Sequence, residues 1–410
     1  MTRADFANTF PSEASENRAM SKEIRDVNLY SASKAIDDIN DEDQAVTFGK
    51  NNGLKIAENG VPTELGYKLG KDYDDPQWND VLDQITKDEM IDTTLHGYVK
   101  NKAIDSIGKP KTAEFDGPSQ VGSFNAAKYG IGYPNATVLA QTFYKDLSYE
   151  YGKQLALEAV SCGYDGLYAP GMNLHRSPFG GRNYEYYSED TILSYLVGAI
   201  QTKAATEKGL TTYVKHFCAN DQETWRNGNS TIMTEQTYRQ GPLKGFEGSF
   251  TKGGSLGTMT SNTRVGFKVV SMDPATMTQV LRNEWGFKGV AMTDSSKGSR
   301  YYLYTNESVD AGIDQFKNDE TRGTSDLKNA LIKDKDGHLW GKARTIAKHY
   351  FYTISRNFAM AGDDVVIDTG ASWWETGIIS VISVLGSVTA IFLALDVTFE
   401  VLENRKKKEM

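Results

Sequence analysis

The chain has 410 residues, of which 39% are hydrophobic and 24% charged, and its formal net charge is −9. This composition is typical of a folded globular protein, and an acidic chain without a basic stripe before its last residues argues against a nucleic-acid partner. Two cysteines, Cys162 and Cys218, are too few for a disulfide framework or a metal cluster, and we expect both to be buried apolar residues beside strands. We expect no metal and no cofactor.

The N-terminal part of the chain is polar. Residues 1–75 are irregular and rich in Gly, Asn and Asp, and we interpret them as an extension, either a linker or the remnant of an upstream domain. No apolar segment of a secretory signal is present there, so we expect either that the long N-terminal part crosses a membrane unaided or that the true start lies upstream of Met1. A helix is predicted where Trp78, Val81, Leu82 and Ile85 recur at helical spacing, and Thr86 with Glu89 forms a capping box for the next one.

From residue 108 to 360, short apolar segments alternate with longer amphipathic ones. We predict strands at KTAEFDGP, YDGLYAPGMN, LTTYVKHF, SLGTMTSN and GVAMTD, with helices over FYKDLSYEYGKQLALEAVSCG up to Gly163, over residues 191–208, and after Asp273 and Pro274. Such alternation is typical of a parallel sheet in an α/β protein. Over this length it favours a closed (β/α)8 TIM-like barrel, which we place at residues 76–360.

The C-terminal region predicts a membrane anchor. Ile378 to Leu395 is an uncharged run of 18 residues, preceded by Trp373 and Trp374 and followed by the basic residues 405–408. Such a run is long enough to span a bilayer, and the positive-inside rule places the tail, residues 396–410, in the cytoplasm. We therefore expect a linker at 361–377, a transmembrane helix at 378–395, and a barrel on the extracellular side of a bacterial cell membrane. The alternative is a buried amphipathic helix.

Polar residues follow the predicted strands. In a parallel barrel the chemistry takes place at the carboxyl ends of the strands, and six residues fall there: Asp116, Asn173, Lys215, His216, Asn262 and Asp294. Asp294 could be a nucleophile, a base or a ligand, or it could cap the following helix. Lys215 and His216 are adjacent, so either one of them points into the barrel or a bulge lets both reach its rim.

Cations and aromatic residues are concentrated between Arg176 and Arg226, a stretch that also holds Arg182, Lys215 and His216. Guanidinium and ammonium donors beside flat aromatic faces suit a pocket for sugar hydroxyls. The alternative is a set of surface salt bridges around a loop. We interpret His96, His338 and His349 as packing or surface residues, and the carboxylates of YEYYSED, Glu185, Glu189 and Asp190, as anchors for a helix start.

Several motifs in register resemble the barrel domain of glycoside hydrolase family 3, of the β-glucosidase type. They are EFDGP, PGMNLHRSPFGGRNYEYYSED, VKHFCANDQETWR and LRNEWGFKGVAMTD, which run in the family's order over residues 75–320. The PGHG motif that follows KHF in the β-N-acetylglucosaminidase branch is absent. The resemblance implies retaining hydrolysis of terminal β-D-glycosides, with a β-linked oligosaccharide or an aryl glycoside as substrate and Asp294 as nucleophile. It also implies that Asp116, Arg182, Lys215, His216 and Arg226 hold the sugar.

Three departures from the family pattern qualify this expectation. Ser295 stands where the family has an aromatic residue, and the loop after MTSN is altered and shortened. The family's acid/base Glu comes from an α/β sandwich domain, which the C-terminal helix leaves no room for, so an upstream domain or another chain would have to supply it. Two competing functions follow: a non-catalytic or vestigial sugar-binding membrane protein, and a lyase or aldolase in which Lys215 forms an imine.

Overall fold

The computed structural model describes residues 46–95, 100–122, 126, 128–226, 229–295, 303, 305–317, 328–329, 331–334, 337–360 and 373–409. His96 and the expected extension up to residue 45 lie outside these residues. Contacts divide the chain into two units: the described residues up to Met360 belong to the first, and helix α14 (Trp373–Glu409) to the second.

The first unit is built on a six-stranded sheet with the order β11-β8-β6-β5-β4-β3. Five of these strands are parallel, and β3 pairs with β4 in the antiparallel sense. The strands are β3 (Lys100–Asn101), β4 (Thr112–Asp116), β5 (Gly166–Tyr168), β6 (Thr211–Phe217), β8 (Gly257–Thr260) and β11 (Val290–Met292). Two smaller sheets contain β1 (Ala57–Glu58) and β2 (Val61–Pro62), and β7 (Ser230–Thr231), β9 (Arg264–Val265) and β10 (Lys268–Val269).

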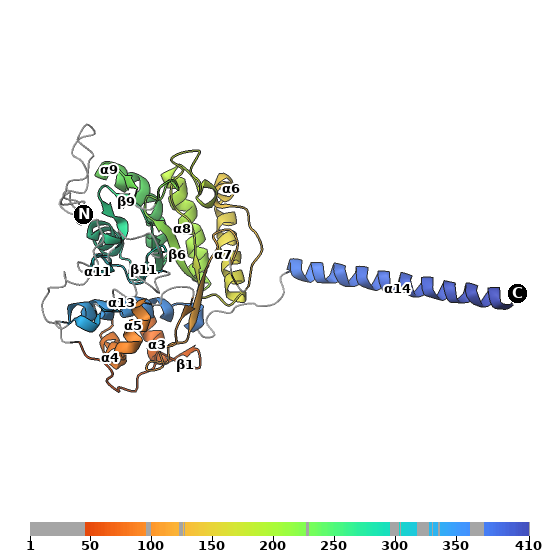
Figure 1. The fold of residues 1–410 in the computed structure, drawn as a ribbon, viewed down its shortest axis with the longest axis horizontal. Helices are drawn as coiled ribbons and strands as arrows, with labels where there is room; N and C mark the ends of the chain where they lie inside the picture. Colours follow the sequence, from red (N-terminus) through yellow and green to blue (C-terminus); the bar gives the residue numbers. More distant parts are fainter. Residues whose placement is uncertain are drawn as a thin grey trace. The chain divides into compact units, whose positions relative to one another are not determined.

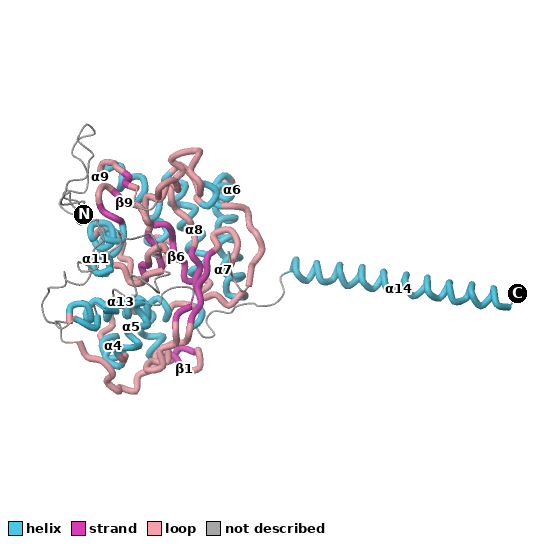
Figure 2. Tube along the Cα trace, in the orientation of Figure 1, coloured by secondary structure: helices cyan, strands magenta, loops and turns pink. Residues whose placement is uncertain are grey.

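Helices cover the sheet (Figures 1 and 2). In chain order they are α3 (Glu64–Lys71), α4 (Gln77–Gln84), α5 (Lys87–Leu95), α6 (Ala136–Gln141), α7 (Lys145–Ser161), η2 (Asn183–Glu185), α8 (Thr191–Glu207), α9 (Glu235–Tyr238), η3 (Arg239–Leu243), α10 (Lys244–Thr251), η4 (Val270–Met272), η5 (Ala275–Glu284), α11 (Thr305–Ala311), α13 (His338–Ser355) and η6 (Phe358–Met360). The capping box is confirmed, because Glu89 N donates to Thr86 Oγ1 at 3.2 Å and Thr86 N to Glu89 Oε2 at 2.9 Å.

The parallel sheet is curled, and its two edges are connected through Gln315. Gln315 forms a parallel bridge with Met292 at the end of β11, while its side-chain amide donates to Asn101 Oδ1 of β3 at 3.5 Å. All seven residues of β6 are buried, as expected for a strand covered on both faces. The expected α/β fold is therefore present. Within the described residues, however, the sheet has five parallel strands and one antiparallel strand, where a regular eightfold repeat was expected.

The folded unit includes part of the segment that the sequence suggested was an irregular extension. Residues 57–71 form β1, β2 and α3, and Ile56 and Leu69 are fully buried in the core. Helix α3 packs closely through glycines: a Cβ on Gly66 would lie 2.0 Å from Ile56 O, and one on Gly70 would lie 2.9 Å from Ser355 O. Leu65 and Leu69 of this helix also pack on the core, but a helix of eight residues is too short for its apolar pattern to be distinguished in the sequence.

The second unit is a single helix with exposed side chains from residue 376 to 409. It is the one helix among the described residues that is long and apolar enough to cross a membrane. The hydroxyl groups of Ser380, Ser383, Ser387, Thr389 and Thr398 each donate to the carbonyl four residues earlier. Such bonds satisfy polar side chains without water and are compatible with an apolar environment.

The two cysteines differ in their surroundings. Cys218 is buried and its Sγ lies 2.8 Å from Tyr238 OH, as the sequence suggested for a core residue after a strand. Cys162 instead caps the C-terminus of α7 and is only half-buried, because the helix ends one residue before it.

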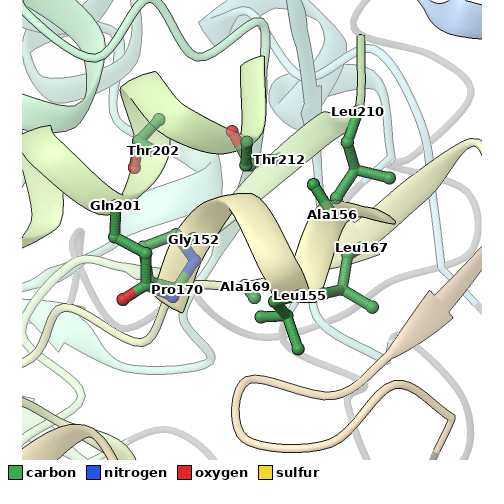
Figure 3. A pocket seen from close by; sticks show the side chains of 11 residues that line it. Gly152, Leu155, Ala156, Leu167, Ala169, Pro170, Gln201, Thr202, Leu210 and Thr212 are labelled. Carbon is green, nitrogen blue, oxygen red and sulfur yellow. The ribbon is translucent and has the colours of Figure 1, made fainter. Parts of the chain in front are cut away.

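A small void lies in the core between α7, α8 and the strands beside them (Figure 3). Its volume is about 10 Å³ and its lining is formed mainly by apolar and small side chains, including Leu155, Ala156, Leu167 and Leu210. A space of that size holds at most one water molecule, so we regard it as a packing gap.

Candidate active site

The ends of the parallel strands bring together the polar residues singled out from the sequence. Lys215 Nζ of β6 lies 2.5 Å from Asp116 Oδ1, the last residue of β4, and 3.0 Å from Glu185 Oε1 of η2. Lys215 and Glu185 are buried, whereas Asp116 keeps 23% of its side chain exposed. The ammonium is therefore held in place by two carboxylates, one of which still faces open space.

Electrostatics keeps Asp116 and Lys215 ionised. Burial raises the pKa of Asp116, but the charges of Lys215, Lys317 and Arg182 outweigh it and hold that pKa below its usual value. Burial lowers the pKa of Lys215, and Asp116 and Glu185 reverse the effect and raise it. A lysine that keeps its proton is a poor nucleophile, which argues against the imine alternative for Lys215.

Arg182 and His216 form the adjoining part of the site. Arg182 Nε donates to Glu185 Oε2 at 2.6 Å, and Arg182 Nη1 lies 3.2 Å from His216 Nε2. His216 Nδ1 lies 3.3 Å from Tyr186 OH, and burial followed by the nearby cations lowers the pKa of His216 well below its usual value. The imidazole is therefore neutral at pH 7, with Nε2 accepting from Arg182 and the protonated Nδ1 donating to Tyr186 OH.

A bulge explains how neighbouring residues of one strand serve the same site. The pairing of β6 with β8 shifts register between Lys215 and Phe217, so that Lys215 opposes Met259 and Phe217 opposes Thr260. Of the two arrangements considered from the sequence, the bulge is the one observed. The backbone of His216 is held by Asn173, whose Oδ1 accepts from His216 N at 2.9 Å and whose Nδ2 donates to His216 O at 3.0 Å.

Asp294 lies two residues beyond β11 and is buried, with 7% of the residue exposed. Its Oδ2 accepts a hydrogen bond from Asn262 Nδ2 at 2.9 Å and lies 3.7 Å from Arg226 Nη1, while its Oδ1 accepts from Ser295 N at 2.7 Å. The hydrogen bonds from Asn262 and Ser295 fix the orientation of the carboxylate, which lies beside the partly exposed Arg226.

Two residues of the site were not expected from the sequence. Glu185 was interpreted as a helix anchor, but it is buried between Arg182 and Lys215; of the three carboxylates in that motif, Asp190 caps α8 by accepting from Leu193 N at 2.7 Å. The spacing of three residues from Arg182 was the available signal, since it places the two side chains on one face of a helical turn. Lys317 follows the Gln315 bridge, which is too short to show strand periodicity.

Lys317 is buried near the same carboxylates. Its Nζ lies 4.4 Å from the centre of the Tyr168 ring, and its pKa is lowered by burial, an effect that Asp294 and Asp116 oppose. Glu223 adds a further carboxylate, with Oε2 at 3.4 Å from Arg226 Nη1. Two of the described histidines outside the site have structural partners: His349 Nδ1 lies 2.8 Å from Asp314 Oδ1, and His338 Nε2 lies 3.1 Å from Asp310 Oδ1.

Similar proteins are β-glucosidases. The chain is 37% identical over 195 residues to a β-glucosidase of Ruminococcus albus, a match that covers 47% of this chain and 20% of that protein. It is 34% identical over 241 residues to a β-glucosidase of Rhizobium radiobacter, covering 58% of this chain and 29% of that protein. The chain therefore spans less than a third of the length of these two relatives.

Solved structures agree in fold. β-Glucosidase 3B from Thermotoga neapolitana in complex with glucose superposes with a TM-score of 0.61 at 27% identity, covering 68% of this chain and 43% of that one. A β-glucosidase from Paenibacillus barengoltzii gives a TM-score of 0.65 at 25% identity and covers 84% of this chain and 37% of that one. Residues 116–335 match the glycosyl hydrolase family 3 N terminal domain. Because this match takes in more than half of the 410 residues and contains every site residue described above, the chain belongs to glycosyl hydrolase family 3.

Proposed function

We propose that this protein hydrolyses terminal, non-reducing β-D-glycosides as a retaining β-glucosidase. The observation that supports this best is the buried Asp294 carboxylate, fixed by Asn262 and Ser295 at one strand end beside the ionised group of Asp116, Lys215 and Arg182. An oriented carboxylate next to a set of hydroxyl-binding charges is what glycosyl transfer to an enzyme requires. The β-glucosidase relatives favour hydrolysis over sugar binding alone.

In the proposed reaction, Asp294 attacks the anomeric carbon and the bond from that carbon to the leaving-group oxygen breaks, while a proton passes to that oxygen. The group that gives this proton is the acid/base. Water then attacks the anomeric carbon and loses a proton to the acid/base, and the bond from that carbon to Asp294 breaks. The products are free Asp294 and a sugar of retained configuration. Asp116 accepts hydrogen bonds from sugar hydroxyls, and Lys215, Arg182, His216 and Arg226 orient the ring.

We infer that the acid/base is a carboxyl group outside the site described here, from an upstream domain or another chain. Asp116 is unsuited, because its lowered pKa keeps it ionised at neutral pH. Glu223 accepts from Asn220 Nδ2 at 2.9 Å and faces Arg226, so it is engaged in holding the arginine beside Asp294. General acid catalysis contributes roughly 10²- to 10⁴-fold. Activated aryl glycosides, which need little protonation, should therefore be the better substrates of this chain alone.

The finer architecture is also part of the proposal. We take the curled sheet to be a barrel of the (β/α)8 type, because Gln315 connects its edges, and we assign residues 76–360 to it as a domain. We further propose that α14 anchors the protein in a bacterial cell membrane, with the catalytic unit outside and the basic residues 405–408 in the cytoplasm.

Hydrolysis of 4-nitrophenyl β-glucoside and β-xyloside by the full chain in detergent micelles tests the function. We expect slow release of nitrophenol that Asp294→Asn lowers by at least about a thousandfold, since the amide cannot attack the anomeric carbon. A 2-deoxy-2-fluoro glycoside should add one glycosyl mass to the peptide that contains Asp294. Equal rates for the two proteins, or labelling at a different residue, would reject Asp294 as the nucleophile.

A further inference from the structure

Exposed apolar side chains are concentrated on α6, on the loop that follows it, and on the first turns of α7 and α8. Six residues there, each between 43% and 76% exposed, form what we call the apolar patch: Val138, Phe143, Tyr144, Leu147, Ile192 and Leu196. Ile192 and Leu196 are one helical turn apart, so they lie on one face of α8. Exposed apolar side chains that gather in one region mark a site of interaction with a protein or a membrane.

The elements that carry the apolar patch are neighbours in space. Helix α6 packs against α7, α8 and η2, and α7 packs along α8. Thr137 Oγ1 of α6 donates to Asn183 O of η2 at 2.8 Å, which holds α6 in this position. Figure 1 shows α6 beside α7 at the edge of the folded unit. The patch therefore occupies one side of this unit.

The charges next to the apolar patch pair with each other. On α7, Lys153 Nζ lies 3.1 Å from Glu150 Oε2, and on α8 Lys203 forms an ion pair with Glu207. These helix surfaces thus carry both signs of charge, whereas a strongly charged partner requires a surface of one sign. Apolar contact is therefore the interaction that this side of the folded unit offers.

The chain leaves the folded unit at the far end of α8. Phe358 N of η6 donates at 2.8 Å to the carbonyl of Gly209, two residues beyond α8, and twelve residues, 361–372, connect Met360 to α14. Twelve residues can span about 40 Å. Helix α8 has 17 residues and is about 25 Å long. The connection is therefore long enough for a bilayer that holds α14 to reach the patch.

A lipid surface fits the apolar patch better than a second copy of the chain does. Phe143 and Tyr144 form the tip of the loop between α6 and α7, and Tyr184 of η2, beside α6, is 59% exposed. Aromatic side chains with one polar end are favoured where headgroups meet acyl chains. Because α14 is covalently linked, its bilayer is present at a high effective concentration, whereas a second copy would have to bind through its bulk concentration alone.

We propose that the apolar patch docks the folded unit on the lipid surface in which α14 is anchored, with Phe143 and Tyr144 inserted among the headgroups. The proposal rests on the membrane anchoring proposed above and extends it, because it gives the folded unit one orientation at the membrane. Since η2 carries Glu185 of the candidate active site and packs on α6, docking also brings that site close to the lipid surface.

Spin labels on the full chain, reconstituted into vesicles of phosphatidylethanolamine and phosphatidylglycerol, test this proposal. Phe143→Cys and Leu196→Cys are labelled one at a time in a Cys162→Ser background, which leaves only the buried Cys218. We expect both labels to collide more with molecular oxygen, which concentrates in the bilayer, than with a water-soluble nickel chelate. A label at Ile332→Cys, a position that is 65% exposed and outside the patch, should show the opposite preference.

Replacing two other patch residues should break the docking. With Tyr144→Ser and Leu147→Ser combined, the label at Leu196 should lose its preference for oxygen. The matched control combines Val61→Ser and Ile332→Ser, which remove two exposed apolar side chains outside the patch, and should keep that preference. Omitting phosphatidylglycerol should change nothing, because the contact is apolar. Circular dichroism checks folding, and alkaline carbonate extraction of the vesicles checks that α14 stays inserted.

The outcomes separate docking from anchoring. Labels at Phe143 and Leu196 that prefer the nickel chelate, on a chain that resists carbonate, would overturn the docking and leave the membrane anchor standing. Labels shielded from both reagents would assign the apolar patch to a protein partner and overturn the lipid assignment. Release of the chain by carbonate would overturn the anchor and, with it, the docking that rests on it.

Discussion

Glu185 shows how much of the site depends on a single side chain. It contacts Arg182 through Oε2 and Lys215 through Oε1, and only 4% of its side chain is exposed. Once the Glu185 carboxylate is removed, the charges of Arg182 and Lys215 repel each other. Neither side chain can become solvated without disturbing the strand ends, so the buried charges stay unpaired.

We therefore expect Glu185→Ala to lower the free energy of unfolding by about 3 kcal/mol, the cost of leaving buried charges unpaired. It should also reduce aryl glucoside hydrolysis, since Arg182 and Lys215 would be displaced. Urea unfolding of the full chain measures the first effect. Glu189→Ala, an exposed carboxylate of the same motif, is the control and should change stability by less than about 0.5 kcal/mol. Similar values for the two variants would contradict the bridging role of Glu185.

Glu114 is a second buried carboxylate, located inside the curled sheet below the site. Tyr213 OH donates to it at 2.6 Å and Tyr168 OH at 3.3 Å, and burial raises its pKa to about 7. Because the pKa in the folded protein lies above the ordinary value of 4.5, the folded state binds the proton more tightly. The resulting stabilisation is complete below pH 4.5 and is lost as the pH rises through about 7.

Glu114→Gln mimics the protonated form and should remove this dependence. Relative to the variant, the wild-type protein is expected to lose on the order of 3 kcal/mol of stability between pH 4.5 and pH 8. The comparison requires urea unfolding of both proteins at several pH values. The difference between them isolates Glu114 from Lys109, which titrates nearby with a pKa lowered by burial to about 7. A difference that stays constant with pH would show that folding does not change the pKa of Glu114.

At the scale of elements, helix α3 combines a buried side chain, Leu69, with a close backbone contact at Gly66. The absence of a Cβ at Gly66 lets the helix approach Ile56 O, where a methyl group would lie only 2.0 Å away. Gly at that position therefore has a packing purpose that outweighs its low helix propensity.

Gly66→Ala should lower the free energy of unfolding by about 2 kcal/mol, because the backbone of Ile56 would have to move. Gly241→Ala serves as the control: Gly241 lies in η3, nothing lies within 4 Å of its ideal Cβ, and its replacement should raise stability by roughly 0.5 kcal/mol. Both changes are measurable by chemical unfolding. Stabilisation by both would mean that α3 does not pack as described.

At the scale of the whole molecule, the chain combines a folded unit that buries most of its apolar residues with a helix, α14, that exposes them. The side chains of α14, such as Ile382 and Leu385, are more than half exposed, whereas the core of the first unit is closed. Exposed apolar residues along a helix of this length are costly in water and favourable in a bilayer.

We expect the full chain expressed in bacteria to stay in the membrane fraction during alkaline carbonate extraction. Replacing Ile382 and Leu385 together by Arg should release most of it, because each central arginine costs about 2.5–3.5 kcal/mol in a membrane helix. Lys407→Arg keeps the charge of the tail and should not alter the distribution. Release of the unmodified chain by carbonate would rule out a spanning helix.

Local patterns in the sequence determined much of this description. The strands that end at Asp116 and near Asp294, the Thr86 capping box and the apolar run of α14 all depend on neighbours along the chain, and the structure confirms these elements. The family was also recognisable, since its motifs are short continuous stretches, and residues 116–335 match it.

Tertiary contacts decided the rest. Glu185 became part of the site because Lys215, 30 positions along the chain, is brought beside it. Lys317 joined the site because Gln315 bridges to Met292. Residues 57–71 joined the core through the close contact of Gly66 with Ile56 and the burial of Leu69. None of these partners lies within one turn or one strand of the other. Periodicity and capping report only interactions between residues close in sequence, so contacts that form when the sheet curls could be seen only in the folded chain.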